Sequence, residues 1–259
     1  MSDPGFPRQR LPLVVAATIV AVAAVVAIAV GVNHAANVGV TRATPTPSLS
    51  PASSPSPTPQ ASLIPFASCS AATFGQPLAP LNPPTSVHKY ASAPSFTIDA
   101  TKLYQATIKT AKGDIVLCLQ PQLAPNTVNN FVTLARNHFY DGIPFHRVVA
   151  GFVIQAGDPN CIGQVGPAPA TPGDACGGGG PGYQFNDELP PKQAYVVGCV
   201  AMATSGANTN GSQFFICTAN DTTLPKSYNL FGNVESGMSV ALGIAQGDLM
   251  QSVTVAQQQ

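Results

Sequence analysis

The pattern of apolar and polar positions divides the chain into three parts. In the first part, every residue from Leu13 to Val32 is uncharged and nearly all are Leu, Val, Ile or Ala. As a helix this run is long enough to cross a hydrocarbon core of about 30 Å. Arg8 and Arg10 precede it, which favours a cytoplasmic N-terminus. We therefore predict a cytoplasmic segment over residues 1–12, a single-pass anchor in the cell membrane over residues 13–32, and an extracytoplasmic remainder.

A cleaved signal peptide is the alternative interpretation of this apolar run. It needs a shorter apolar core of about 7 to 15 residues, followed by small residues at the cleavage site. His34 stands where a small residue is wanted, and Ala27 and Ala29 lie inside the apolar run. The pattern favours a retained anchor and leaves cleavage open.

Prolines mark the second part of the chain. Between Thr41 and Ser62 they stand at positions 45, 47, 51, 55, 57 and 59, separated mostly by Ser, Thr and Ala. Such a segment buries too little apolar surface to offset the entropy lost on ordering. We predict that residues 33–99 form a linker and extension, disordered where proline is frequent.

The third part, residues 100–259, has the composition of one globular domain. β-Branched and aromatic residues alternate over Tyr104–Thr110 and Asp114–Leu119, which predicts a hairpin. Pro125–Asn137 is predicted to be a helix that Asn126 and Thr127 cap. Its expected core face, at helical spacing, consists of Val128, Phe131, Val132 and Ala135.

Short apolar runs separated by Gly- and Asn-rich turns follow this helix. They are Phe145–Val149, Phe152–Ala156, Tyr195–Met202 and Gln213–Thr218. Many short strands with one or two helices favour a mostly antiparallel sheet that closes on itself. We therefore predict a mainly β protein built as a β-barrel.

Charge and motifs exclude several classes of protein. Eleven Lys and Arg balance eleven Asp and Glu, without the basic clusters that phosphate binding needs, so we expect no nucleic-acid partner. The chain contains no GxSxG, Walker or HExxH motif and no CxxC pair. His138 and His146 are eight residues apart with no third ligand in view. We expect neither a cofactor nor a metal.

The six cysteines permit disulfides on the outer side of a membrane. Six thiols allow 15 complete pairings, so the sequence leaves the pairing open. Cys161 and Cys176 are the first candidates because they flank one Gly/Pro-rich loop, and closing a short loop costs the least entropy. Two free thiols are the alternative for this pair.

Four stretches in a fixed order carry a resemblance to a known family. They are FHRVVAGFVIQAGDP from Phe145, GGPGYQFNDE from Gly179, GCVAMATSGANTNGSQFFICT from Gly198, and LFGNV from Leu230. Together they closely resemble the cyclophilins, and the similarity runs from about Tyr104 to Val255. The resemblance implies a closed eight-stranded antiparallel barrel capped by two helices, with a proline-binding groove on its outside.

The resemblance also implies roles for individual residues. Arg147 matches the catalytic arginine, Gln155 would orient it, and Tyr228 stands where a polar aromatic residue closes the rim. The positions expected to bind the substrate's proline and backbone are Phe152, Val153, Ala203, Thr204, Gln213, Phe215 and Leu224. Thr223 departs from the family, since many members have Trp there. Neither Cys161 nor Cys176 belongs to this set, so we expect their loss to affect the loop more than catalysis.

From this resemblance we expect a monomeric peptidyl-prolyl cis/trans isomerase that acts on proline-containing segments of exported or envelope proteins. The alternative is a non-catalytic proline-binding or chaperone module tethered to the membrane. The presence of Arg147 favours the isomerase over the binding module, because a module that only binds proline has no need of this hydrogen-bond donor.

Overall fold

The computed structural model describes residues 67–81, 88–163, 176–189, 195–221 and 224–259. Among these, no helix is long and apolar enough to span a bilayer. The predicted anchor over residues 13–32 and the proline-rich stretch from Thr41 to Ser62 lie outside the described residues.

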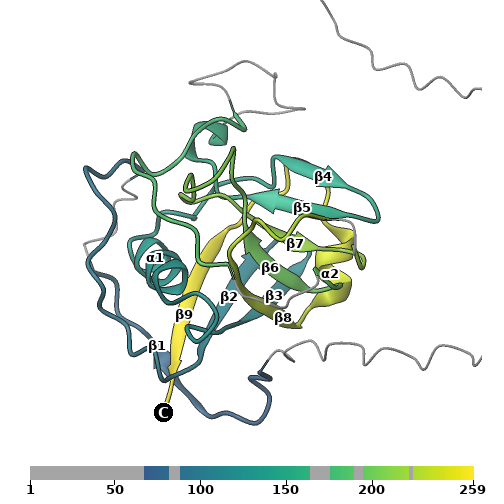
Figure 1. The fold of residues 1–259 in the computed structure, drawn as a ribbon. Helices are drawn as coiled ribbons and strands as arrows, with labels where there is room; N and C mark the ends of the chain where they lie inside the picture. Colours follow the sequence, from purple (N-terminus) through teal and green to yellow (C-terminus); the bar gives the residue numbers. More distant parts are fainter. Residues whose placement is uncertain (1–66, 82–87, 164–175, 190–194, 222–223) are drawn as a thin grey trace, which may run out of the picture. The chain divides into compact units, whose positions relative to one another are not determined.

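One sheet of nine strands organises the described part of the chain (Figure 1). Its order is β1-β9-β2-β3-β8-β6-β7-β5-β4, and every neighbouring pair is antiparallel. The strands are β1 (Phe74–Pro77), β2 (Tyr104–Thr110), β3 (Gly113–Leu119), β4 (Arg147–Val149), β5 (Val153–Ala156), β6 (Cys199–Met202), β7 (Phe214–Cys217), β8 (Leu230–Ser236) and β9 (Ser252–Gln258). The predicted hairpin is confirmed as β2 and β3, which pair over their full length.

The mainly β architecture is confirmed, but the closed eight-stranded barrel is wrong in two respects. A ninth strand, β1, comes from the extension and pairs with β9. In the described residues, β1 and β4 end the hydrogen-bonded order and no ladder joins them. β4 has three residues and pairs only with β5, so its free edge is too short to close the barrel by hydrogen bonds to β1.

Two helices pack against this sheet. α1 (Pro125–Arg136) contacts β8 and β9, whereas α2 (Met238–Gly243) contacts β3, and Figure 1 draws them on opposite sides of the strands. A short 3₁₀ turn spans Pro159–Cys161. The predicted core face of α1 is confirmed, since Val128, Phe131, Val132 and Ala135 are all buried. Burial of this apolar stripe against the sheet stabilises the helix.

The predicted cap of α1 is wrong. The helix begins at Pro125, one residue before Asn126. Its N-cap residue is Ala124, and no side-chain hydrogen bond caps the helix from this position. Asn126 and Thr127 therefore lie inside the first turn, where their backbone N–H groups are donors without helical acceptors. Glu188 accepts from both, at 2.9 and 2.8 Å, from some sixty residues along the chain.

Glu188→Gln should lower the free energy of unfolding by about 1 to 2 kcal/mol. The glutamine side chain lacks the negative charge that strengthens these two hydrogen bonds. Its NH₂ group also replaces one carboxylate oxygen, so a donor then faces a backbone N–H group. Urea denaturation checks this, with Asp114→Asn, an exposed carboxylate on β3, as the matched control. Equal unfolding free energies for the two variants would contradict the cap.

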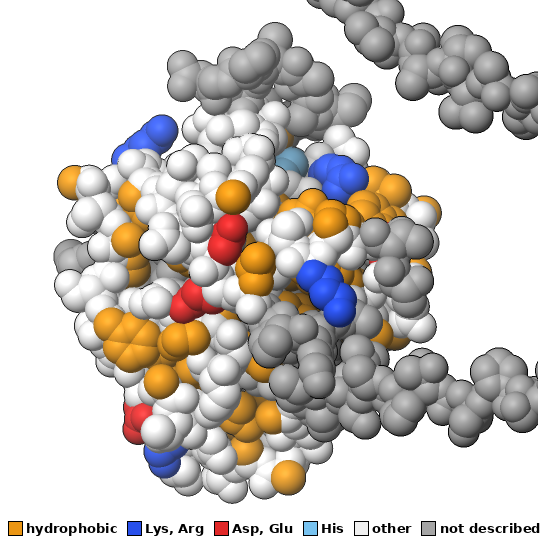
Figure 2. Space-filling model, in the orientation of Figure 1, with side chains coloured by type: hydrophobic (Ala, Val, Ile, Leu, Met, Phe, Trp, Pro, Cys, Tyr) orange, Lys and Arg blue, Asp and Glu red, His pale blue; other side chains and the backbone are white. Residues whose placement is uncertain are grey.

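Charged side chains are sparse on the surface of the described residues. On the face drawn in Figure 2, the Lys and Arg side chains are separated from one another by uncharged and apolar groups. This face therefore lacks a continuous basic patch of the kind that binds a phosphate backbone.

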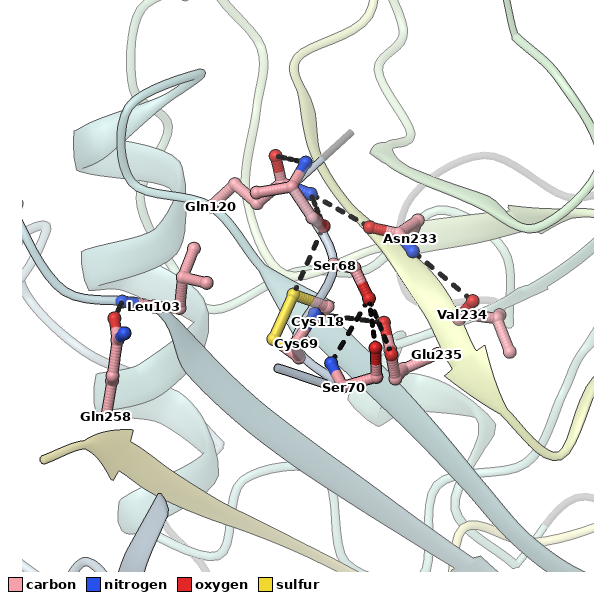
Figure 3. Close-up of a disulfide and its surroundings, with 11 residues drawn as sticks. Ser68, Cys69, Ser70, Leu103, Cys118, Gln120, Asn233, Val234, Glu235 and Gln258 are labelled. Atoms are coloured by element: carbon pink, nitrogen blue, oxygen red, sulfur yellow. Dashed lines mark hydrogen bonds between the residues drawn. A yellow bond between two sulfur atoms is a disulfide. The ribbon is translucent and has the colours of Figure 1, made fainter. Parts of the chain in front are cut away.

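The extension is fastened to the sheet at Cys69 (Figure 3). Cys69 forms a disulfide with Cys118 of β3, and its backbone N–H donates to Glu235 of β8 at 3.1 Å. The side chain of Gln120 exchanges two hydrogen bonds with the backbone of Ala67, at 3.0 and 3.1 Å. Residues before position 100 thus pack on the same sheet as those after it.

The other four cysteines form two further disulfides. Cys161–Cys176 is the predicted bridge, and Cys199–Cys217 joins directly opposite residues of β6 and β7. All six cysteines of the chain are paired.

Candidate active site

Alternation along four neighbouring strands places one row of side chains on the outer face of the sheet. Arg147 of β4 lies opposite Gln155 of β5, Gln155 lies opposite Phe215 of β7, and Phe215 lies opposite Ala201 of β6. Successive side chains of a strand point to opposite faces. The neighbours of these residues along each strand, such as Ile154 beside Gln155 and Ile216 beside Phe215, accordingly lie in the core.

A hollow of about 260 Å³ opens over this row. Phe152 reaches it from the turn before β5, Ala203 and Thr204 from the end of β6, and Leu224 and Tyr228 from the segment before β8. Its full lining is Arg147, Phe152, Val153, Gln155, Ala203, Thr204, Phe215, Leu224 and Tyr228. The structure thus brings together nine of the ten predicted site residues, and the tenth, Gln213, borders the neighbouring hollow.

Arg147 stands at the rim of this hollow with an exposed side chain. Its Nη1 donates to Oε1 of Gln155 at 3.3 Å, and its guanidinium carbon lies 5.6 Å from the ring centroid of Phe152. A guanidinium over an aromatic face gains a cation–π attraction. These two contacts restrict the orientation of a side chain that would otherwise sample many rotamers.

The apolar wall of the hollow rests on a residue that the sequence analysis missed, Tyr195. Its hydroxyl donates to the backbone oxygen of Tyr228 and accepts from the backbone N–H of Tyr228, both at 3.0 Å. Burial raises the pKa of Tyr195, so the hydroxyl keeps its proton. Phe215 and Tyr228 meet edge to face at 5.4 Å. Tyr195 was predicted to start a strand, but β6 begins only at Cys199.

The Cys199–Cys217 disulfide lies in the same apolar cluster as the wall. Both cysteines are buried there with Val153, Phe215 and Leu230. The bridge joins β6 to β7 and lies in this cluster with Val153 and Phe215, which line the hollow.

A second hollow, of about 580 Å³, lies beside the first and shares Gln155, Ala203 and Thr204 with it. The glycine-rich segment Gly177–Gly182 and Lys89 of the extension form part of its wall. The resemblance did not imply either of these. Polyglycine carries no pattern that points to a binding wall, and Lys89 is far from the site in sequence.

The two histidines considered as metal ligands have other surroundings. His138 Nδ1 lies 2.9 Å from Oδ2 of Asp141, whereas His146 is buried beside Arg147. Burial lowers the pKa of His146, and the negative charge of Asp158 offsets part of this shift, so the ring is neutral at neutral pH. Within the described residues no group of three or more His, Cys, Asp or Glu could hold a metal. Thr223 lies outside the described residues.

Comparison with known proteins gives one consistent result. The profile of the family described as cyclophilin type peptidyl-prolyl cis-trans isomerase/CLD matches residues 105–258. The chain is 40% identical over 158 residues to a peptidyl-prolyl cis-trans isomerase of Helicobacter pylori, which covers 60% of this chain and 88% of that protein. It is 41% identical over 167 residues to peptidyl-prolyl cis-trans isomerase B of Streptomyces anulatus, covering 56% of this chain and 85% of that protein.

Among solved structures, the chain is similar to a cyclophilin type peptidyl-prolyl cis-trans isomerase of Cryptosporidium parvum, crystallised in the presence of the dipeptide Ala-Pro. The TM-score is 0.49 at 27% sequence identity, and the match covers 58% of this chain and 98% of that chain.

Proposed function

The chain belongs to the cyclophilin-type peptidyl-prolyl cis-trans isomerases. From this premise we propose that it accelerates rotation about X-Pro bonds in exported or envelope proteins, and that it does so by stabilising the twisted amide without covalent chemistry. The observation that carries the proposal is the guanidinium of Arg147, oriented by Gln155 and Phe152 at the rim of an apolar hollow.

The reaction explains why such a site suffices. Rotation about an X-Pro bond breaks amide resonance, with a barrier of about 18 to 20 kcal/mol, and no bond forms or breaks. In the twisted state the proline nitrogen recovers its lone pair and can accept a hydrogen bond that the planar amide cannot. Arg147 is suited to donate this bond because a guanidinium stays protonated at every physiological pH.

Arg147 alone would not supply the whole acceleration. A hydrogen bond to a charged group contributes about 1.5 to 3 kcal/mol, whereas a 10⁴-fold acceleration needs about 5.5 kcal/mol. We assign the remainder to the apolar wall, in which Phe152, Phe215 and Leu224 would hold the proline ring. Tyr228 would close the rim. Such a wall fixes the substrate geometry and disfavours the polar planar amide.

Exchange spectroscopy on a short Ala-Pro peptide tests the activity with the full-length chain. We expect the cis and trans signals to exchange faster in proportion to enzyme concentration. A proline-binding module without catalysis would shift the peptide signals but leave the exchange rate at its uncatalysed value, and that result would favour the alternative function.

The membrane location is a separate part of the proposal. It is supported by the uncharged run from Leu13 to Val32 and by three disulfides, which are typical of oxidising compartments outside the cytoplasm. We expect the full chain to stay in the membrane fraction through high-salt and carbonate washing. A soluble protein whose mature N-terminus lies beyond Ala29 would contradict the anchor and favour secretion.

A further inference from the structure

We propose that the Cys161–Cys176 disulfide and the Gly177–Gly179 segment that follows it position Arg147, through Asp158, Gln213 and Gln155. This role rests on the proposed isomerase function, which it deepens by naming the residues that set the direction of the catalytic donor.

Asp158 ties together the two segments that flank the Cys161–Cys176 disulfide. Its carboxylate is completely buried and accepts from the backbone N–H groups of Asn160, Gly177 and Gly179, at 2.8, 2.6 and 2.8 Å. Asn160 lies next to Cys161, and Gly177 lies next to Cys176. A Cβ atom on Gly179 would stand 2.2 Å from Oδ1 of Asp158, so this close approach requires glycine.

The Gly177–Gly179 segment holds one end of the Gln213 side chain. The amide nitrogen of Gln213 donates to the backbone oxygens of Gly179 and Gly177, at 2.8 and 3.2 Å. Its amide oxygen accepts from Nε2 of Gln155 at 2.9 Å. Oε1 of Gln155 in turn accepts from Arg147. A continuous series of hydrogen bonds thus connects the Gly177–Gly179 backbone to the guanidinium of Arg147.

This series has a direction. A glutamine amide has a donor end and an acceptor end, whereas a guanidinium has only donors. The carbonyl oxygens of Gly177 and Gly179 require the NH₂ group of Gln213, so the oxygen of Gln213 faces Gln155. The oxygen of Gln155 then faces Arg147. If the carbonyls of Gly177 and Gly179 moved away, both glutamine amides could reverse, and Gln155 would present an NH₂ group to the donors of Arg147.

The disulfide keeps these carbonyls in place, because Gly177 directly follows Cys176. Because Cys161 and Cys176 are absent from the predicted groove, the sequence led us to expect that their loss affects the loop more than catalysis, whereas these contacts predict a measurable effect on catalysis. The effect is expected on turnover, since Arg147 is assigned to the twisted state and not to ground-state binding.

The test compares two disulfide variants of the full-length chain. Cys161→Ser with Cys176→Ser should lower kcat for an Ala-Pro peptide about 2- to 10-fold, the effect of one misdirected hydrogen bond, with KM within about twofold. Cys69→Ser with Cys118→Ser removes a bridge that has no contact with this series, and should leave kcat within about twofold. Both are measured at a temperature where circular dichroism shows them folded.

A double-mutant cycle separates positioning from general loosening of the domain. In an Arg147→Ala background, removal of the Cys161–Cys176 bridge should lower kcat no further. Wild-type kcat in the bridge variant, or an equal fall in both backgrounds, would overturn the proposal.

A second readout does not depend on activity. The guanidinium NMR signals of Arg147 should shift or broaden when Cys161–Cys176 is removed and stay unchanged when Cys69–Cys118 is removed. If the wild-type chain fails to catalyse exchange, the proposed function fails, and unchanged Arg147 signals in both variants would overturn the positioning role independently.

Discussion

Arg147→Ala should lower kcat/KM for an Ala-Pro peptide about 10- to 150-fold, which is the effect of losing one hydrogen bond from a charged donor in the transition state. The fold should survive, because the Arg147 side chain is exposed and its hydrogen bond to Gln155 and its ring contact with Phe152 lie at the rim. We expect the free energy of unfolding to change by less than about 0.5 kcal/mol. Peptide exchange spectroscopy and urea denaturation measure the two quantities on the same protein.

Two further variants control this experiment. Arg147→Lys keeps the charge but loses the planar fork, so its activity should lie between those of wild type and Arg147→Ala. Lys109→Ala removes an exposed cation from β2 that borders neither hollow, and should leave kcat/KM unchanged. Wild-type kcat/KM in folded Arg147→Ala would show that the donor lies elsewhere.

Removal of the Cys69–Cys118 bridge should cause the largest loss of stability. The bridge joins residues 49 apart, and releasing such a loop costs about 2 to 4 kcal/mol through the entropy of the unfolded chain. For a domain of this size, that loss lowers the thermal midpoint by about 4 to 15 °C. Differential scanning calorimetry of Cys69→Ser with Cys118→Ser checks this value.

The attachment of the extension supplies the control for this stability experiment. Glu235→Gln leaves the bridge intact but weakens the bonds that Ser68 and Cys69 make to the Glu235 carboxylate, at 3.0 and 3.1 Å. Because these bonds are largely exposed, we expect a loss of at most about 1 kcal/mol. An unchanged midpoint in the cysteine variant would mean that the hydrogen bonds of β1 and Gln120 hold the extension without the disulfide.

Several features followed from the sequence because they depend on residues close together in the chain. The alternation over Tyr104–Thr110 was enough to predict β2, and the helical spacing of Val128, Phe131, Val132 and Ala135 was enough to predict the buried face of α1. The four family stretches identified the site residues as a set, and the structure places nine of the ten around one hollow.

Elements with weak local patterns could not be located from their own residues, although the resemblance correctly implied a second helix. α2 has six residues, of which only Ala241 is buried, so it carries no amphipathic stripe. β1 is four residues long and ends at a proline, within the segment that was predicted to be a linker and extension. Short elements of this kind are stabilised by their neighbours and not by their own propensities.

By itself, the sequence determined the family, the strand alternation that separates core from groove, and the residues that can serve an isomerase. Only the tertiary structure decided the pairing of Cys69 with Cys118 and of Cys199 with Cys217, the cap that Glu188 provides for α1, and the contact of Gln213 with the Gly177–Gly179 backbone. The physical reason is common to all of them. Each joins residues between 18 and 62 positions apart. It therefore exists only once the whole sheet has brought two distant segments together, and no local pattern records which segments those will be.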